Sequence, residues 1–377
     1  MLIEIHMLKN YPSTNLNRDD MGAPKSCVFG GVQRARISSQ CLKRSWRVSP
    51  LFQKEMEGHL GMRTRKMPQL VAARLKEMGM ADEFLPAIEK KLTGFANKGG
   101  KENDLGITNQ IVIYSPEDIQ AIADVMKTAL DGVKTAKDVE KLKATEIEKM
   151  VKGAATRPVS LDIALFGRMV TSTAFADVEA SMQVAHAFST NRVVMETDFF
   201  TAMDDMINGQ EDLGSGMMGD VDYNSSCYYI YASLDVDKLR ENLQYAEDAD
   251  ALVKEAVPAL LRAMAYSNPS GKQNTFAGNV LPLAVLAECK EYPVPVSYAN
   301  AFVKPISAAY DMDLIQNSIC ALQKNVKDTV RDFPMLADAK RIWFKAGEKV
   351  DFPDMPSVKI AANYDELVQD VSAILSR

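Results

Sequence analysis

Residues 227–234, Cys-Tyr-Tyr-Ile-Tyr-Ala-Ser-Leu, are rich in aromatic and β-branched side chains, which is typical of a β-strand. Other stretches with strand or helix periodicity flank this one in both directions along the chain. We expect strands at residues 2–8, 160–166 and 283–288, and helices at residues 38–47 and 249–266. The order strand–helix–strand–strand–helix–strand is the split βαβ pattern of ferredoxin-like folds, which include the RNA-recognition fold. The sequence therefore predicts an α+β fold with a ferredoxin-like, RNA-recognition-like palm.

Two insertions interrupt this pattern. Residues 55–155 are helical in character, with helices expected at residues 67–80, 82–92, from 115 onward, and at 136–152. Residues 191–224 form a long polar insertion, and loops of this length are usually functional or disordered. Pro258 should kink the helix at 249–266 or mark a boundary. We divide the chain into a first palm segment with a basic helix (1–54), helical fingers (55–155), a second palm segment (156–190), a thumb hairpin (191–224) and a third palm segment (225–377).

The basic residues concentrate in one segment. The net charge is −6, but residues 25–54 hold seven cations and no acid, which leaves −13 for the rest of the chain. On a helix capped by Ser38 or Ser39, several polar side chains share an arc of about 100° beside an apolar stripe of Leu42 and Trp46. These polar side chains are Gln40, Lys43, Arg44 and Arg47. A basic segment on an acidic body is typical of a phosphate-binding surface, and a solvated face without function is the alternative.

The composition excludes several classes of protein. Hydrophobic residues make up 47% and charged residues 25%, which argues against disorder and coiled coil. No apolar run approaches the ~20 residues that span a bilayer, and the first residues lack the layout of a signal peptide. The five cysteines are scattered and without C-x-x-C spacing, so we expect reduced thiols and a cytoplasmic protein with no membrane association.

No motif in the chain indicates a cofactor, a metal site or a catalytic nucleophile. The glycine pattern at residues 214–219 matches a dinucleotide fingerprint, but acidic residues precede it where a strand should, and a strand follows where a helix should. The three histidines, His6, His59 and His186, lack ligand spacing, and His186 lies in an apolar stretch that favours a structural role.

Two pairs of adjacent aspartates are candidates for binding catalytic magnesium. Asp19-Asp20 and Asp204-Asp205 each lie in a loop rich in turn residues. Asx turns account for such acids, and the first pair could also orient Arg18. We favour a structural role for both pairs.

Several motifs in the right order carry a resemblance to a known family. They begin with Asn-Arg-Asp-Asp at 17–20, Phe-Gly-Gly at 29–31 and Arg-Ala-Arg-Ile-Ser-Ser-Gln-Cys-Leu-Lys-Arg at 34–44. Others lie at 162–169, 183–187, 198–202 with 204–205, 224–226 and, more loosely, 271–273. Together they closely resemble the CasC family, the backbone subunit of Cascade, the type I-E CRISPR surveillance complex. Asn191, where many relatives have His, and the tip residues Met217 and Met218 depart from the family pattern.

The resemblance implies a right-hand shape in which a palm carries helical fingers and a thumb. Copies of such a subunit stack head to tail along CRISPR RNA, and each thumb folds over RNA held by the neighbour and kinks it. The guide between kinks stays open to pair with target DNA, and other Cascade subunits complete the complex. A separate helicase-nuclease cuts the DNA, so the resemblance implies that this subunit is not an enzyme.

A protein that accepts any guide should bind phosphate and sugar rather than base edges. By position we assign to the RNA backbone Arg18, Lys25, Arg34, Arg36, Ser38, Gln40, Lys43 and Arg44, with Arg168 and Met169 approaching from the palm and Lys272 from a later loop. The thumb residues are Phe199, Phe200, Met217 and Met218. The two methionines could displace a base from the stack or pack on a neighbouring subunit.

Two other functional classes stay open. One is a metal-dependent ribonuclease that uses Asp19 or Asp20, as backbone subunits of the related type III complexes use a loop aspartate. The other is a free-standing single-strand binder without a guide complex.

Overall fold

The polypeptide divides into two units in the computed structural model, which describes all residues except 96, 98–99, 132–134, 154–156, 171, 173, 203–216, 310–311, 348–351, 354, 356 and 377. The sheet unit comprises Met1–Phe52, Gln183–Asp235 and Val257–Arg377. The helical unit comprises Gln53–Met182 and Val236–Ala256, so it extends beyond the expected fingers at 55–155.

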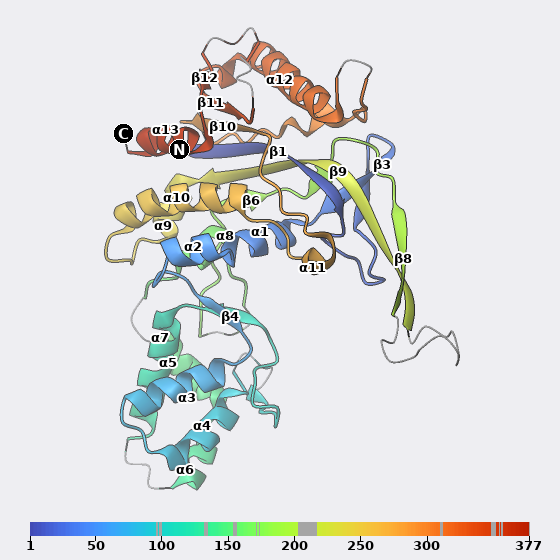
Figure 1. The fold of residues 1–377 in the computed structure, drawn as a ribbon. Coiled ribbons are helices and arrows are strands. Elements are labelled where there is room, and N and C mark those ends of the chain that lie inside the picture. The colour runs from blue at the N-terminus through green and yellow to red at the C-terminus, as the bar shows by residue number, and fades with distance from the viewer. Residues whose placement is uncertain are drawn as a thin grey trace, which may run out of the picture. The chain divides into compact units, whose positions relative to one another are not determined.

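Strands and helices occur in groups along the chain (Figure 1). The strands are β1 (Leu2–Thr14), β2 (Ser26–Phe29), β3 (Val32–Ile37), β4 (Met62–Thr64), β5 (Val112–Tyr114), β6 (Met182–Val184), β7 (Ala187–Ser189), β8 (Glu196–Ala202), β9 (Met217–Asp235), β10 (Ala284–Lys290), β11 (Lys340–Lys345) and β12 (Lys359–Ile360). The α-helices are α1 (Ser39–Arg47), α2 (Pro50–Glu55), α3 (Met67–Glu77), α4 (Leu85–Leu92), α5 (Pro116–Ala129), α6 (Ala136–Lys141), α7 (Ala144–Gly153), α8 (Leu161–Phe166), α9 (Val236–Asn242), α10 (Ala249–Tyr266), α11 (Gln273–Phe276), α12 (Leu314–Asp332) and α13 (Tyr364–Leu375). Short 3₁₀ turns include η1 (Asp82–Phe84), η3 (Tyr298–Phe302) and η4 (Pro334–Leu336).

One large sheet organises the sheet unit. Its strand order is β12-β11-β10-β1-β9-β7-β3-β2, and β6 and β8 also pair with β9. The central strand β1 runs antiparallel to β9, from Leu2 opposite Asp235 to Thr14 opposite Asn224, and antiparallel to β10 on its other side. The pair β11–β12 is parallel. Of the predicted α+β fold, the combination of helices with a mostly antiparallel sheet is confirmed, as are strands at 2–8, 227–234 and 283–288.

Helices cover both faces of this sheet (Figure 1). On one face, Leu8 of β1 packs in a core cluster with α12 residues such as Ile319 and Leu322. On the opposite face, where α1 and α10 lie, Ile3 and Ile5 are buried. Because both faces are covered, the polar residues that alternate with these apolar ones along β1 are buried too.

A buried charge network occupies the α12 face of the sheet. Glu288 accepts a hydrogen bond from Arg341 Nε at 2.5 Å and from the Tyr298 hydroxyl at 3.0 Å, and its Oε2 lies 3.2 Å from His6 Nε2. Lys290 forms an ion pair with Glu4. Burial alone would raise the pKa of Glu288, but the hydrogen bond and charge of His6, together with Arg341 and Lys290, hold this pKa at about 2. The network therefore depends on an ionised Glu288.

The expected strand at 160–166 is wrong, because this segment forms helix α8 (Leu161–Phe166) in the helical unit. All residues from Leu161 to Leu165 are buried. The alternation of apolar and polar side chains in this segment therefore does not reflect one buried and one exposed face of a strand. The place of the second strand is taken by β7, which pairs with β9 and β3. Strand β7 was not predicted, because it is only three residues long.

The helical unit has its own core, built from α3, α4, α5 and α7, with residues such as Val71, Leu92 and Ile122 fully buried. The predicted start of α5 is confirmed, since Ser115 and Asp118 form a reciprocal capping box. The predicted single helix at 136–152 is instead two helices, α6 and α7, because Leu142 between them is extended. These two helices are also less exposed than expected, because Val139 of α6 and Ile147 and Val151 of α7 are buried.

Pro258 lies inside one continuous helix, α10, and the division between the units falls next to it, between Ala256 and Val257. The five cysteines are free thiols. Among the residues that the structure describes, no helix is both long enough and apolar enough to span a membrane.

Candidate nucleic-acid interface

Helix α1 presents polar side chains because its apolar residues are buried in the sheet unit. The Ser38 hydroxyl caps the helix by accepting a hydrogen bond from the Cys41 N–H at 3.3 Å. Leu42 and Trp46 are buried, as predicted, whereas Gln40 and Arg44 are exposed. Lys43 is half-buried, and burial lowers its pKa. The exposed face of the helix is therefore polar and basic.

A groove runs along this face of α1. One hollow of about 500 Å³ is lined by Arg18 and its loop, by Cys41, Arg44 and Ser45 of α1, and by Ser270 and Gly271. A second hollow of about 510 Å³ shares Arg44, Ser45 and Ser270 with the first and continues past Tyr266, Asn268 and Asn279. We call the two together the α1 groove. Its cations, hydroxyls and amides are groups that bind phosphate and ribose.

The two loops that form one wall of the groove are packed tightly together. A Cβ atom on Gly271 would lie 2.3 Å from the Leu16 carbonyl oxygen, so only glycine fits there. The next residue, Lys272, has φ of +49°, a left-handed backbone that is unusual for a residue with a side chain. Such strain persists where the surrounding structure holds it, and it is found most often at functional sites. Lys272 is thus held beside the groove by its own loop.

Asp19 supports the shape of the loop at residues 17–23. Asp19 Oδ1 accepts hydrogen bonds from the backbone N–H groups of Met21 and Ala23, each at 3.0 Å. The structural role that we predicted for Asp19 is therefore confirmed. Asp20 is exposed and also lines the hollow. The second pair, Asp204-Asp205, lies outside the described residues.

The basic surface continues from α1 to the hairpin of β2 and β3. Burial raises the pKa of the Cys41 thiol, and the charges of Lys25 and Arg44 oppose this, so both cations lie within electrostatic reach of Cys41. Arg36 of β3 donates from its NH1 group to His186 Nδ1 at 2.9 Å. Lys25 also acts electrostatically on His186. Lys25 is therefore within electrostatic reach of both Cys41 of α1 and His186.

Two residues assigned to RNA from the sequence serve inside the fold instead. Arg34 has no exposed surface, and its guanidinium donates hydrogen bonds to four backbone carbonyls, those of Ser189, Thr190, Phe302 and Val303. Ser38 is only 6% exposed, and its hydroxyl accepts the hydrogen bond that caps α1. Arg34 was indistinguishable by sequence from Arg36, because both lie on one strand and only the depth of packing separates them.

Arg168 and Met169 lie in the helical unit and not in the sheet unit, where we had placed them. Arg168 is buried and forms an ion pair with Asp118 at 2.5 Å. Arg157 donates to the other oxygen of that carboxylate at 2.8 Å. Arg168 is therefore bound to α5 of its own unit, whereas Met169 is 90% exposed.

The insertion at 191–224 contains an antiparallel hairpin arm of β8 and the first part of β9, with Glu196 opposite Tyr223 and Ala202 opposite Met217. The arm extends away from the rest of the sheet (Figure 1). Paired residues share a face, so Phe200 and Met217 lie on one face and Phe199 and Met218 lie on the other. All four are exposed. The arm thus offers apolar groups in two directions.

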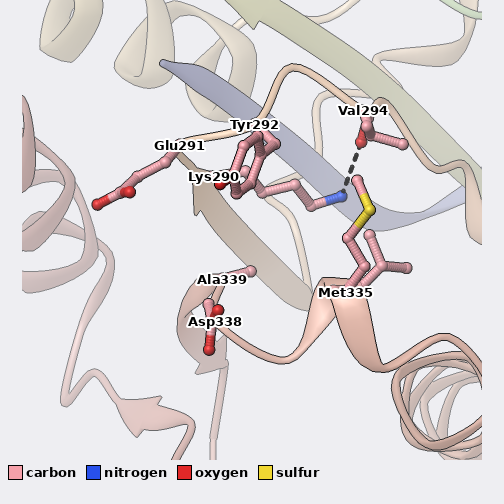
Figure 2. A pocket seen from close by; sticks show the side chains of 8 residues that line it. Lys290, Glu291, Tyr292, Val294, Met335, Asp338 and Ala339 are labelled. Atoms are coloured by element: carbon pink, nitrogen blue, oxygen red, sulfur yellow. Dashed lines mark hydrogen bonds between the residues drawn. The ribbon is translucent and has the colours of Figure 1, made fainter.

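Another hollow in the sheet unit, of about 270 Å³, does not suit a nucleic acid. Figure 2 shows Lys290 reaching into it, where its amine donates to the Val294 carbonyl at 3.3 Å. The same amine is paired with Glu4, and Glu291 and Asp338 add negative charge to the lining. Among the described residues, no group of three or more His, Cys, Asp or Glu side chains is arranged to hold a metal ion.

The family of the chain follows from its match to a family model. The model described as CT1975-like protein matches residues 3–370. The chain belongs to the CT1975-like protein family. This CRISPR-associated family confirms the resemblance to a Cascade backbone subunit that the motifs at 17–44 indicated.

Two solved structures are similar to this CT1975-like chain. A chain of a "CRISPR RNA-guided surveillance complex, pre-nicking" has 29% sequence identity and a TM-score of 0.83, and each chain is covered over 100% of its length. A chain of another "CRISPR RNA-guided surveillance complex" has 24% identity and a TM-score of 0.62 over 99% of both chains, which is a likeness of fold. No curated protein matches the sequence.

Proposed function

We propose that this CT1975-like protein is a non-catalytic backbone subunit of a Cascade complex that coats CRISPR RNA and holds it for recognition of target DNA. The observation that carries the proposal is the α1 groove, in which Arg18 and Arg44 line one hollow together with the hydroxyls of Ser45 and Ser270. The family and the similarity to chains of RNA-guided complexes support it.

The topology of the sheet supports an RNA-recognition-like palm. Strands β10-β1-β9-β7 are adjacent in this order, and each adjacent pair is antiparallel. Numbered by their place in the chain, they give the order 4-1-3-2. Helix α1 lies between β1 and β7 in sequence, and α10 lies between β9 and β10, as the split βαβ pattern requires.

In this proposal the protein binds RNA independently of the nucleotide sequence. Arg18, Lys25, Arg36, Gln40, Lys43, Arg44 and Lys272 are the described candidates on the sheet unit. The guanidinium and ammonium groups would neutralise phosphates, while hydroxyls such as those of Ser45 and Ser270 would bind sugar. The base edges would then stay free to pair with another strand.

The hairpin arm is the proposed link between copies. A non-closing head-to-tail contact between identical subunits generates an open filament, which suits a long guide. Because the arm has apolar side chains on both faces, one face can cover RNA while the other packs on the next subunit. Phe200 and Met217 form one such face, and Phe199 and Met218 form the other.

Shortening the arm tests this assembly. We expect that replacing residues 199–220 by Asn-Gly, a turn suited to two-residue hairpins, leaves the protein folded but abolishes cooperative coating of long RNA. The Asp198–Val221 pair would then close the hairpin. Electron microscopy and titration on long and short RNA would measure the effect.

Binding to a short, single-site RNA should fall far less, since the α1 groove is unchanged. A matched control that keeps the arm but carries Thr197→Ala should coat long RNA as the wild type does. Undiminished cooperativity in the shortened protein would show that the arm does not connect subunits.

We also expect no cleavage of bound RNA in magnesium or manganese. Asp19 accepts hydrogen bonds from two backbone N–H groups, and Asp20 lines the same hollow as the cations Arg18 and Arg44. Gel analysis of labelled RNA after prolonged incubation is the measurement. Specific cleavage that is lost in Asp20→Ala would assign the protein to the metal-dependent ribonucleases instead.

A further inference from the structure

The pair of His186 and Arg36 is a feature of the basic surface that the sequence did not indicate. Its geometry follows from the pairing of β3 with β7, in which Arg36 lies opposite Phe188. His186 directly precedes β7 (Ala187–Ser189), and its ring lies within hydrogen-bond distance of the Arg36 guanidinium. His186 is exposed although it lies in an apolar stretch.

The hydrogen bond between the two side chains fixes the state of the imidazole. A guanidinium can only donate, so His186 Nδ1 must accept the bond from Arg36 NH1 at 2.9 Å. The ring is therefore neutral, with its proton on Nε2. Arg36 is held in place by a second bond, from its Nε to the Ser26 carbonyl at 3.2 Å. Within the described part of the chain, no protein partner occupies His186 Nε2 or Arg36 NH2.

We propose that His186 and Arg36 together bind a backbone phosphate of the RNA and that His186 takes up a proton when the phosphate binds. This inference rests on the proposed function. A phosphate oxygen can accept from Arg36 NH2 and from the His186 Nε2–H at the same time. A proton from solvent then adds to Nδ1, the bond from Arg36 to Nδ1 is lost, and the phosphate accepts from the guanidinium in its place.

The surrounding charges favour this change of state. In the free protein, burial together with the nearby charges of Arg36 on β3 and Lys25 before β2 lowers the pKa of His186 from its ordinary value of 6.5. A bound phosphate adds negative charge and raises that pKa. The pKa of His186 is then higher in the complex than in the free protein. RNA affinity should therefore increase as the pH falls through the pKa of the complex, and level off below the pKa of the free protein.

Titration of the histidine ring by NMR tests the proposal directly. The chain has only three histidines, and His186→Gln identifies the resonance of His186. The spectra are recorded from pH 5 to 8, with and without a short oligouridine at saturating concentration. We expect RNA to raise the pKa of His186 by about one unit. His59, an exposed residue of the helical unit, is the internal control.

A second measurement follows affinity for the same oligouridine at constant ionic strength. Wild-type affinity should rise several-fold from pH 8 to pH 5.5, and the rise should be smaller in His186→Gln, which cannot titrate. If RNA binds but neither the His186 pKa nor the pH slope responds, this inference is wrong and the proposed function stands. If no RNA binds at any pH, the proposed function itself fails.

Discussion

RNA affinity should fall roughly 100-fold or more when Arg18→Glu and Arg44→Glu are combined. Both side chains are exposed and line the same hollow of the α1 groove. A hydrogen bond to a charged group contributes about 1.5–3 kcal/mol, and each tenfold change in affinity corresponds to about 1.4 kcal/mol. We choose Arg18 rather than Lys43 because Lys43 is half-buried and its substitution would disturb packing.

Fluorescence anisotropy with labelled single-stranded RNA at several salt concentrations measures this loss. Each lost phosphate contact should lower the slope of log affinity against log salt by about 0.7, so the double variant should lose roughly 1.4. The control is Lys324→Glu with Lys340→Glu, which changes the net charge equally but alters exposed cations of α12 and β11. Equal losses in the two double variants would mean that total charge, and not the groove, determines binding.

The second large effect is on stability, where Glu288→Ala should lower the free energy of unfolding by about 3–5 kcal/mol. Removing one partner of a buried ion pair leaves the other charge uncompensated, here that of Arg341. Chemical denaturation followed by circular dichroism measures the change. The control is Glu291→Ala, which removes an exposed carboxylate three residues after Glu288. It should change the free energy of unfolding by no more than about 0.5 kcal/mol.

The same residue predicts a dependence of stability on pH. The folded-state pKa of Glu288 is about 2, below its ordinary value of 4.5. The stabilisation is therefore fully present above pH 4.5 and is lost as the pH falls from 4.5 toward 2. Glu288→Gln should show a shallower loss of stability over this interval. A similar slope in the two proteins would contradict an ionised Glu288 in the folded state.

The strands and the basic helix could be predicted from the sequence because their signals are local. Ser38, Leu42 and Trp46 give α1 its cap and its buried stripe within nine residues. Residues 227–234 have such strong strand character that tertiary contacts were not needed to place them in β9. Segment 160–166 lacked this advantage, since residues 161–165 are all buried and such a run has no exposed face that distinguishes a helix from a strand.

The candidate interface was only partly predictable for a different reason. Charge is visible in a sequence, but the use of a charged side chain depends on contacts between distant residues. Arg34 donates hydrogen bonds to the carbonyls of Phe302 and Val303, and Arg168 forms an ion pair with Asp118. Both cations are therefore bound inside the fold. His186 has apolar neighbours in sequence, which favoured a structural role, and only the structure shows that its ring is exposed and bonded to Arg36.

The identity of the RNA bound in cells tests the central claim most directly. The tagged protein is purified with its natural partners, and the RNA that accompanies it is extracted and sequenced. A backbone subunit of Cascade should carry guide RNAs of uniform length, each with a variable spacer between constant repeat-derived ends. RNA fragments of mixed length and origin, or the absence of RNA, would contradict the account.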